Sequence, residues 1–285
     1  MRNLNHQLKQ LCRRNRDGSY STQATRERLL TRVANELHEL GFRGLQARSL
    51  KPKHVEALTA RWLKIGLSTG TIKNRMSAIR WWAEKIDKRN VVARDNSHYG
   101  IPDRSFVVDR SKALRVDELA LAQVKDQHVH MSLRLQAAFG LRREEAIKFS
   151  PSYADRGHEL RLKASWTKGG KERVIPIRTA EQRQILKEAR ALAGRGSMIP
   201  SHRNYKAQLR VYERHTANSG LSRLHGLRHA YAQMRYQELT GWPSPAAGGP
   251  LTLSPEDRRI DQAARAQVSR ELGHERVAIA NTYLG

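Results

Sequence analysis

Apolar residues recur at intervals of three and four through residues 1–90, a spacing typical of amphipathic helices. Between 23 and 40, for example, Leu30, Val33, Ala34 and Leu37 share one face, and Gly41 ends the pattern. The spacing predicts helices over residues 4–14, 23–40, 52–65 and 71–88. We therefore expect the first part of the chain to be wholly helical.

The predicted helix over 71–88 has two unlike faces. Its apolar face is expected to point inward and carries Ile72, Met76, Ile79, Trp82 and Ile86. Its other face carries the polar and basic residues Lys73, Asn74, Arg75 and Arg80. Such a face is either solvated surface or a contact with DNA phosphates, and the charge favours phosphate contact because neutralising phosphate suits a basic helical face.

The helical pattern fails over residues 93–111, which are rich in charge and turn formers and are interpreted as an interdomain linker. Periodicity then predicts helices over 116–125, 129–139, 180–193, 205–217 and 229–238, a short helix opened by Arg142 and a last helix leading to His274. Alternation over 158–166 and 173–177, around the Gly-rich turn 167–171, predicts a β-hairpin.

The predicted fold class is mainly α with a small antiparallel sheet. We expect two domains, a helical one over 1–92 and a second over 112–285, joined by the linker 93–111. The loop Gly241–Pro255 is unusually long for a compact domain, so we expect it to be mobile or functional.

Charge narrows the expected partners. The 285 residues include 53 Lys and Arg against 27 Asp and Glu, a net charge of +26, which favours a polyanion such as DNA or RNA. Charge alone leaves a ribosomal protein or a membrane-surface binder open. Cys12 is the only cysteine, so no intramolecular disulfide can form. With no long apolar run, we expect a soluble cytoplasmic protein without a membrane partner.

Several side chains suit chemistry on a phosphodiester. Arginine holds non-bridging oxygens by bidentate contact, and Arg142 and Arg228 are our candidates. Arg143 is a rival for Arg142, and for each arginine taken alone a surface ion pair is the simpler explanation. Glu145, one turn after Arg142, is placed to pair with that arginine or orient it.

Proton donors and a nucleophile complete the candidate set. Lys168, on the Gly-rich turn, is suited to donate a proton to a leaving oxygen, with Lys171 as competitor and a solvated turn lysine as the simpler alternative. His225 lies three residues before Arg228, and His274 lies nine before Tyr283. A phenol attacking phosphorus forms a phosphotyrosine ester that conserves bond energy. The histidines lack a third ligand at a recognisable spacing, so no metal is expected.

Together, in this order, these segments resemble the tyrosine recombinases, the phage-integrase family. GLRREE resembles the first arginine box of that family, TKGGKERVIPI its hairpin lysine segment, LHGLRHAYA its His-x-x-Arg box and LGHERVAIANTY its terminal box. The stretch LKPKHVEALTARWLKIGLSTGTIKNRMSAIRWWAEKI resembles the helical core-binding, SAM-like domain of the family. The resemblance spans nearly the whole chain.

The resemblance implies a role for each residue. Arg142 and Arg228 would hold the scissile phosphate, and Lys168 would protonate the leaving 5′ oxygen. His225 would assist proton transfer at the tyrosine, and His274 would hydrogen-bond the phosphate. Tyr283 would attack to form a 3′-phosphotyrosyl link without any cofactor, and Glu145 would support the site.

The implied protein is a bacterial, nucleoid-associated integrase that inserts or excises a mobile element. Its implied partners are double-stranded DNA carrying a specific recombination site, three further copies in a homotetramer on two sites, and accessory DNA-bending proteins. Two departures from the family pattern stand out: the gap from Arg228 to His274 is long, and only two residues follow Tyr283. The alternatives are an Xer-like resolvase, a type IB topoisomerase, or a DNA-binding accessory protein without catalysis.

Overall fold

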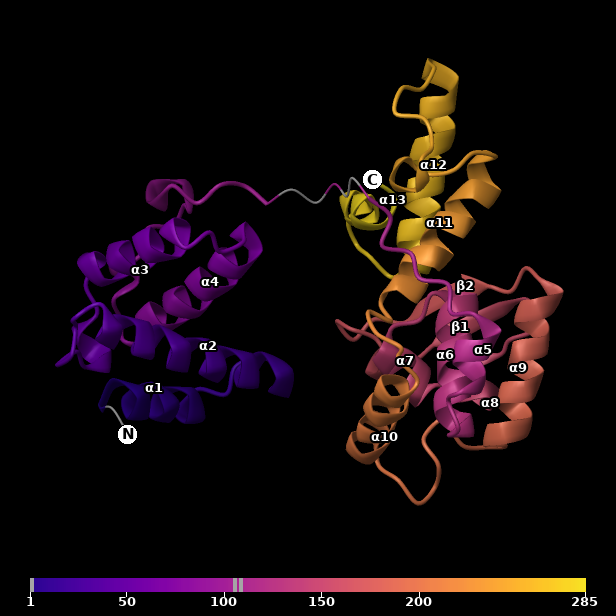
Figure 1. The fold of residues 1–285 in the computed structure, drawn as a ribbon, viewed down its shortest axis with the longest axis horizontal. Coiled ribbons are helices and arrows are strands. Elements are labelled where there is room, and N and C mark those ends of the chain that lie inside the picture. The colour runs from indigo at the N-terminus through magenta and orange to yellow at the C-terminus, as the bar shows by residue number, and fades with distance from the viewer. Residues whose placement is uncertain (1–2, 105–106, 108–109) are drawn as a thin grey trace. The chain divides into compact units, whose positions relative to one another are not determined.

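The computed structural model describes residues 3–104, 107 and 110–285, which form two compact units, Met1–Ser105 and Phe106–Gly285 (Figure 1). Part of the predicted linker packs on the first unit, since Ile101 is buried in its core and the Tyr99 hydroxyl accepts from the Ala93 backbone N–H at 2.8 Å. Positions 105, 106, 108 and 109 of that linker lie outside the described residues. The boundaries at 92 and 112 remain a prediction.

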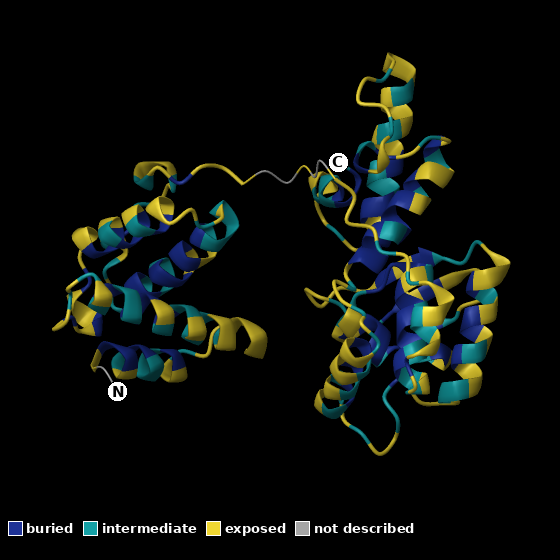
Figure 2. Ribbon diagram, viewed as in Figure 1, coloured by how far each residue is buried: buried dark blue, intermediate teal, exposed yellow. Residues whose placement is uncertain are grey.

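The first unit is helical, as predicted. Its elements are α1 (Asn3–Arg14), α2 (Tyr20–Glu39), η1 (Ala47–Ser49), α3 (Pro52–Lys64), α4 (Thr69–Lys85), η2 (Arg89–Val91) and η3 (Ser97–Tyr99). Serine caps start two helices, because the Ser19 and Ser68 hydroxyls accept from backbone N–H groups in the first turns of α2 and α4. Trp62 and Trp82 are fully buried in its core. All four α-helices contribute buried residues to this core (Figure 2).

Helix α4 presents the predicted apolar face to this core, but Arg75, predicted on the opposite basic face, is buried as well. Arg75 is 4% exposed, donates to Glu36 at 3.0 Å and lies 5.0 Å over the Trp62 ring. The prediction that Arg75 lies on an exposed basic face is wrong. The carboxylate of Glu36 and the aromatic face of Trp62 together offset the cost of burying its charge.

The second unit is mainly helical around one short sheet. Its elements are α5 (Glu118–Ala122), α6 (Gln127–Phe139), α7 (Arg143–Lys148), α8 (Pro151–Ala154), β1 (Glu159–Leu162), η4 (Ala164–Trp166), β2 (Arg173–Pro176), α9 (Ala180–Ala193), α10 (Tyr205–Asn218), α11 (Gly226–Thr240), η5 (Pro245–Ala247), α12 (Pro255–Glu271), η6 (Val277–Ala280) and α13 (Asn281–Leu284). Helix α6 packs against α7, α9 and α11. The fold class predicted from the sequence is confirmed.

Strands β1 and β2 pair antiparallel, with Leu160 opposite Ile175 and Leu162 opposite Arg173. The first strand ends earlier than predicted. The chain turns into η4 instead, because Trp166 inserts into the core beside Phe149 and Tyr153, at ring distances of 6.2 and 5.6 Å. The prediction of strand up to Trp166 is therefore wrong, although the hairpin itself is present.

The long loop after α11 contains η5, which packs against α13. Its backbone closes tightly: the Gly249 N–H donates to the Ser244 carbonyl at 2.9 Å, and a Cβ at Gly249 would lie 1.8 Å from the Pro243 carbonyl oxygen. This half of the loop therefore has a defined shape that requires glycine. No helix within 3–104 or 110–285 combines the length and apolar character needed to cross a bilayer.

Candidate active site

Tyr283 lies on the short C-terminal helix α13 and is 5% exposed. Its hydroxyl oxygen accepts from Arg228 Nε at 3.3 Å and lies 3.5 Å from His225 Nε2. His225 is the N-cap residue of α11, and Arg228 is in the first turn of that helix. The fold therefore brings together three of the predicted residues, although Tyr283 is 55 positions from Arg228 along the chain.

Arg228 is almost completely enclosed, at 1% exposure. One terminal nitrogen donates to the Gly140 carbonyl, and the other donates to the Leu272 carbonyl and lies 3.4 Å from His274 Nε2. Burial, then the charges of Arg173 and Arg142, lower the pKa of Arg228 to about 10. The guanidinium therefore stays charged at neutral pH and brings a fixed cation to the tyrosine hydroxyl.

Arg142 caps α7 and shares Glu145 with a second arginine. The Arg142 side chain donates to Glu145 at 2.7 Å, and its backbone N–H donates to the same carboxylate at 2.8 Å. Arg173 donates to Glu145 at 2.6 Å and to the Leu272 carbonyl at 2.6 Å. Burial acts to raise the pKa of Glu145, but the charges of Arg173, Arg228 and Arg142 outweigh burial, so its pKa is lowered and it stays ionised.

Sequence reasoning missed Arg173. A signal was present: in strand β2, Arg173 falls on the same face as the buried Ile175, so alternation alone would have pointed its side chain inward. With this residue, three arginines and one buried carboxylate form a connected network beside Tyr283.

The three histidines around Tyr283 are held in the neutral form. Burial, then Arg228 and Arg142, lower the pKa of His225. The same causes, with Arg173 added, lower the pKa of His274 to about 3. His229, which sequence reasoning did not single out, is buried with its ring 4.6 Å from that of Tyr283, and burial lowers its pKa to about 4. A neutral imidazole next to the Tyr283 hydroxyl is able to accept the phenolic proton.

The predicted lysine is not brought into this cluster. Lys168 is exposed on the turn between the strands, where Gly169 and Gly170 have φ of +94° and +68°. Its rival Lys171 forms an ion pair with Glu275, the neighbour of His274. The rival arginine, Arg143, pairs at the surface with Glu213 at 3.0 Å.

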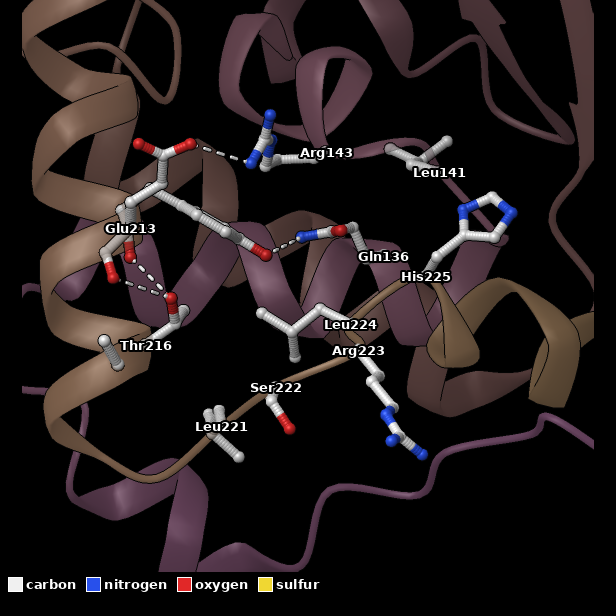
Figure 3. Close-up of a pocket in the computed structure, with 12 residues that line it drawn as sticks. Gln136, Leu141, Arg143, Glu213, Thr216, Leu221, Ser222, Arg223, Leu224 and His225 are labelled. Carbon is white, nitrogen blue, oxygen red and sulfur yellow. Dashed lines mark hydrogen bonds and ion pairs between the residues drawn. The ribbon is translucent and has the colours of Figure 1, made fainter. Parts of the chain in front are cut away.

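A cavity of about 460 Å³ opens beside His225 (Figure 3). Leu141, Tyr212 and Leu224 are among the residues that line it. Arg143 and Glu213, which form an ion pair, line it as well. Arg223, two residues before His225, has a φ of +53°, an unusual value for a residue with a side chain. Among the described residues, no three His, Cys, Asp or Glu side chains gather to hold a metal ion.

The predicted DNA-contacting residues of the first unit differ in surroundings. Asn74 is exposed, and Lys73 forms an ion pair with Asp103 at 2.9 Å. Arg80 donates to the Ala93 carbonyl at 3.0 Å and so braces its own unit. A role in DNA contact stays a prediction for these three residues.

Residues 1–92 match the family model described as "Phage integrase, N-terminal", and residues 93–234 match the one described as "Integrase". The fold is similar to a lambda integrase dimer bound to a COC′ core site, with a TM-score of 0.62, 16% identity and coverage of 99% of this chain and 77% of that one. It is also similar to XerH site-specific recombinase bound to palindromic difH substrate, with a TM-score of 0.57, 19% identity and coverage of 99% of this chain and 81% of that one. A third similar structure is the Tn1549 transposon integrase with circular intermediate DNA, with a TM-score of 0.53, 13% identity and coverage of 100% of this chain and 96% of that one. Comparison with curated proteins by sequence gives no match.

The two family models, the order of the motifs and the architecture agree. The chain belongs to the tyrosine recombinase family, also called the phage integrase family. It is accordingly a site-specific DNA recombinase of the tyrosine type.

Proposed function

We propose that this recombinase cuts and rejoins DNA through Tyr283, by way of a 3′-phosphotyrosyl link. The observation that supports this most directly is the position of the Tyr283 hydroxyl, 3.3 Å from Arg228 Nε and 3.5 Å from His225 Nε2. A nucleophile next to both a fixed cation and a neutral proton acceptor is the arrangement that attack on a phosphodiester requires.

In the proposed step, the phenolic oxygen forms a bond to phosphorus as the bond from phosphorus to the 5′ oxygen breaks. The phenolic proton passes to His225, whose lowered pKa keeps it neutral and able to accept. Arg142 and Arg228 stabilise the charge on the non-bridging oxygens, and His274 donates a hydrogen bond to one of them. Lys168 delivers a proton to the 5′ oxygen once the Gly-rich turn lies against DNA, and Glu145 holds Arg142 in place.

The biological role that we propose is integration or excision of a mobile element. Four copies would act on two DNA sites, each a double-stranded recombination site, with accessory DNA-bending proteins, in the bacterial cytoplasm. Two similar structures support this interpretation: a lambda integrase tetramer bound to a Holliday junction, and the Tn1549 transposon integrase in complex with circular intermediate DNA. The excess of basic residues supports DNA as the partner.

A trapping experiment on DNA of random sequence tests the chemistry and finds the site at the same time. A duplex library with a randomised region and staggered nicks is incubated with the full chain, and adducts that survive denaturant are isolated and sequenced. A nick next to the cleavage point lets the short 5′-hydroxyl fragment diffuse away, so the adduct accumulates. We expect adducts that share a sequence, with protein on the 3′ end of the cut strand.

Tyr283→Phe is the decisive control, because it removes the hydroxyl and keeps the ring packing. We expect no adduct from this variant, with DNA affinity unchanged. Tight binding of DNA without any adduct from the wild-type chain would instead identify an accessory DNA-binding protein. Relaxation of supercoils with little sequence demand would point to a topoisomerase.

A further inference from the structure

The segment just after the unit boundary lies against the helix that carries His225 and Arg228. The Leu114 backbone N–H donates to the Gly226 carbonyl at 2.9 Å. A Cβ added at Gly226 would lie 2.6 Å from Leu114 Cβ and 2.7 Å from the Lys112 carbonyl oxygen. Only glycine allows this approach, so the path of Ser111–Leu114 is closely matched to the start of α11.

One side chain of α11 joins this segment to the tyrosine. Gln233, 9% exposed, accepts a hydrogen bond from the Ser111 hydroxyl at its Oε1, at 2.9 Å. Its Nε2 donates to the backbone carbonyl of Tyr283 at 3.0 Å. The orientation of the amide is determined by these contacts, because a flipped amide would set its oxygen against the Tyr283 carbonyl oxygen. Ser111 Oγ in turn accepts from the Ala113 backbone N–H at 3.1 Å.

Helix α13 depends on such contacts for its position. It contains only Asn281–Leu284, too few residues to be stable by itself. Arg265 of α12 donates to the Asn281 side chain and to the Gly285 carbonyl, each at 2.8 Å. Gln233 supplies the hydrogen bond at Tyr283 itself. Of the two described residues Gln233 and Arg265, only Gln233 is also hydrogen-bonded to Ser111.

We propose that Gln233 is a positioning residue that sets Tyr283 for attack, and that Ser111 acts through it. A change in the path of the segment Ser111–Leu114 is thereby transmitted to Tyr283 by two hydrogen bonds, from Ser111 to Gln233 and from Gln233 to the Tyr283 carbonyl. The inference rests on the proposed function, since it concerns the same tyrosine. It adds a dependence of strand cleavage on the segment Ser111–Leu114.

Ser111→Ala, Gln233→Met and the double variant test this proposal in the full chain. The measurements are the single-turnover rate of adduct formation at saturating DNA and, separately, the Kd for that DNA. One hydrogen bond contributes about 0.5–1.5 kcal/mol, so each single variant is expected to cleave roughly 2- to 12-fold more slowly with unchanged Kd. Because Ser111 acts through Gln233, the double variant should be no slower than Gln233→Met.

Gln237→Met makes the same chemical change at an exposed position of the same helix and should match the wild type. Hydrogen exchange of the backbone amides of residues 281–285 gives a readout independent of chemistry, and it should accelerate in Ser111→Ala. Ser111 is exposed, so this variant remains informative even if Gln233→Met folds poorly.

Two results overturn the proposal. Rates of Ser111→Ala and Gln233→Met equal to those of the wild type, or rate losses that multiply in the double variant, would show that no such coupling exists. Absence of adduct from the wild-type chain is a different failure, because it refutes the proposed function and the inference together.

Discussion

Replacing Arg173 by methionine is the most direct test of the network behind the active site. Methionine keeps much of the side-chain volume but removes the charge. The Glu145 carboxylate, 0% exposed, then loses its 2.6 Å partner, and the Leu272 carbonyl loses one of its two arginine donors. A buried ion pair broken on one side leaves a charge without sufficient compensation.

The expected loss is about 3 kcal/mol in the free energy of unfolding of the second unit, at the low end for a broken buried pair, because Arg142 still donates to Glu145. For a unit of this size, that corresponds to a melting temperature lower by about 6–12 °C. Arg173→Lys keeps the charge but lacks the planar fork that reaches two acceptors, so we expect an intermediate loss.

Hydrogen exchange across a urea series, read by mass spectrometry, follows each unit through its own peptides. Peptides from the first unit serve as an internal control and should keep their midpoint. The matched variant is Arg143→Met, which breaks the Arg143–Glu213 pair, at 49% and 54% side-chain exposure. Such surface pairs contribute less than about 1 kcal/mol.

A loss in Arg173→Met no larger than that in Arg143→Met would refute the reasoning. It would mean that Glu145 is already compensated by Arg142 and the backbone, so that Arg173 adds nothing to the stability of the site.

Three further predictions follow from other parts of the molecule. First, the folded-state pKa values of His229 and His274, about 4 and about 3, lie below their ordinary value, so the unfolded chain binds more protons than the folded chain. The free energy of unfolding should therefore fall as pH drops from 6.5 to 4.5, by up to roughly 1.4 kcal/mol per pH unit for each histidine. His229→Phe should reduce this dependence on pH, as measured by urea titrations at several pH values. Second, Gly249→Ala should lower the melting temperature of the second unit, whereas Gly44→Ala, which meets no atom within 4 Å, should not affect the first. Third, adduct formation should persist in EDTA, and its loss on chelation alone would contradict the metal-free mechanism.

Local signals predicted most of the helices. Helix α9 has the bounds expected from the sequence, Ala180–Ala193, because the capping box of Thr179 and Gln182 starts it and Gly194 ends it. Such signals act over a few residues, so they are readable without tertiary information.

The errors lie where tertiary contacts override local preference. Arg75 lies on the inner side of α4 because Glu36 and Trp62, from other helices, compensate its charge. Trp166 leaves the strand pattern because the core beside Tyr153 accommodates its ring. None of these three partners is adjacent in sequence to the residue it contacts, so periodicity could not identify them.

The candidate site was predicted from family motifs rather than from periodicity. Motif order singled out Arg228 and Tyr283, but not the hydrogen bonds through Gly140, Leu272 and Gln233 that hold them. Those contacts involve backbone oxygens and an ordinary glutamine, which carry no sequence signature.

The two carbonyl oxygens that hold Arg228 have a consequence for energetics. A guanidinium on a mobile surface chain would lose rotational freedom each time substrate arrived. Here Gly140 and Leu272 immobilise it beforehand, so that freedom is lost once, as the chain folds. In the proposed mechanism, strand cleavage then takes place in an electrostatic field that needs little rearrangement, and preorganisation of this kind is usually the largest contribution to the rate of such sites.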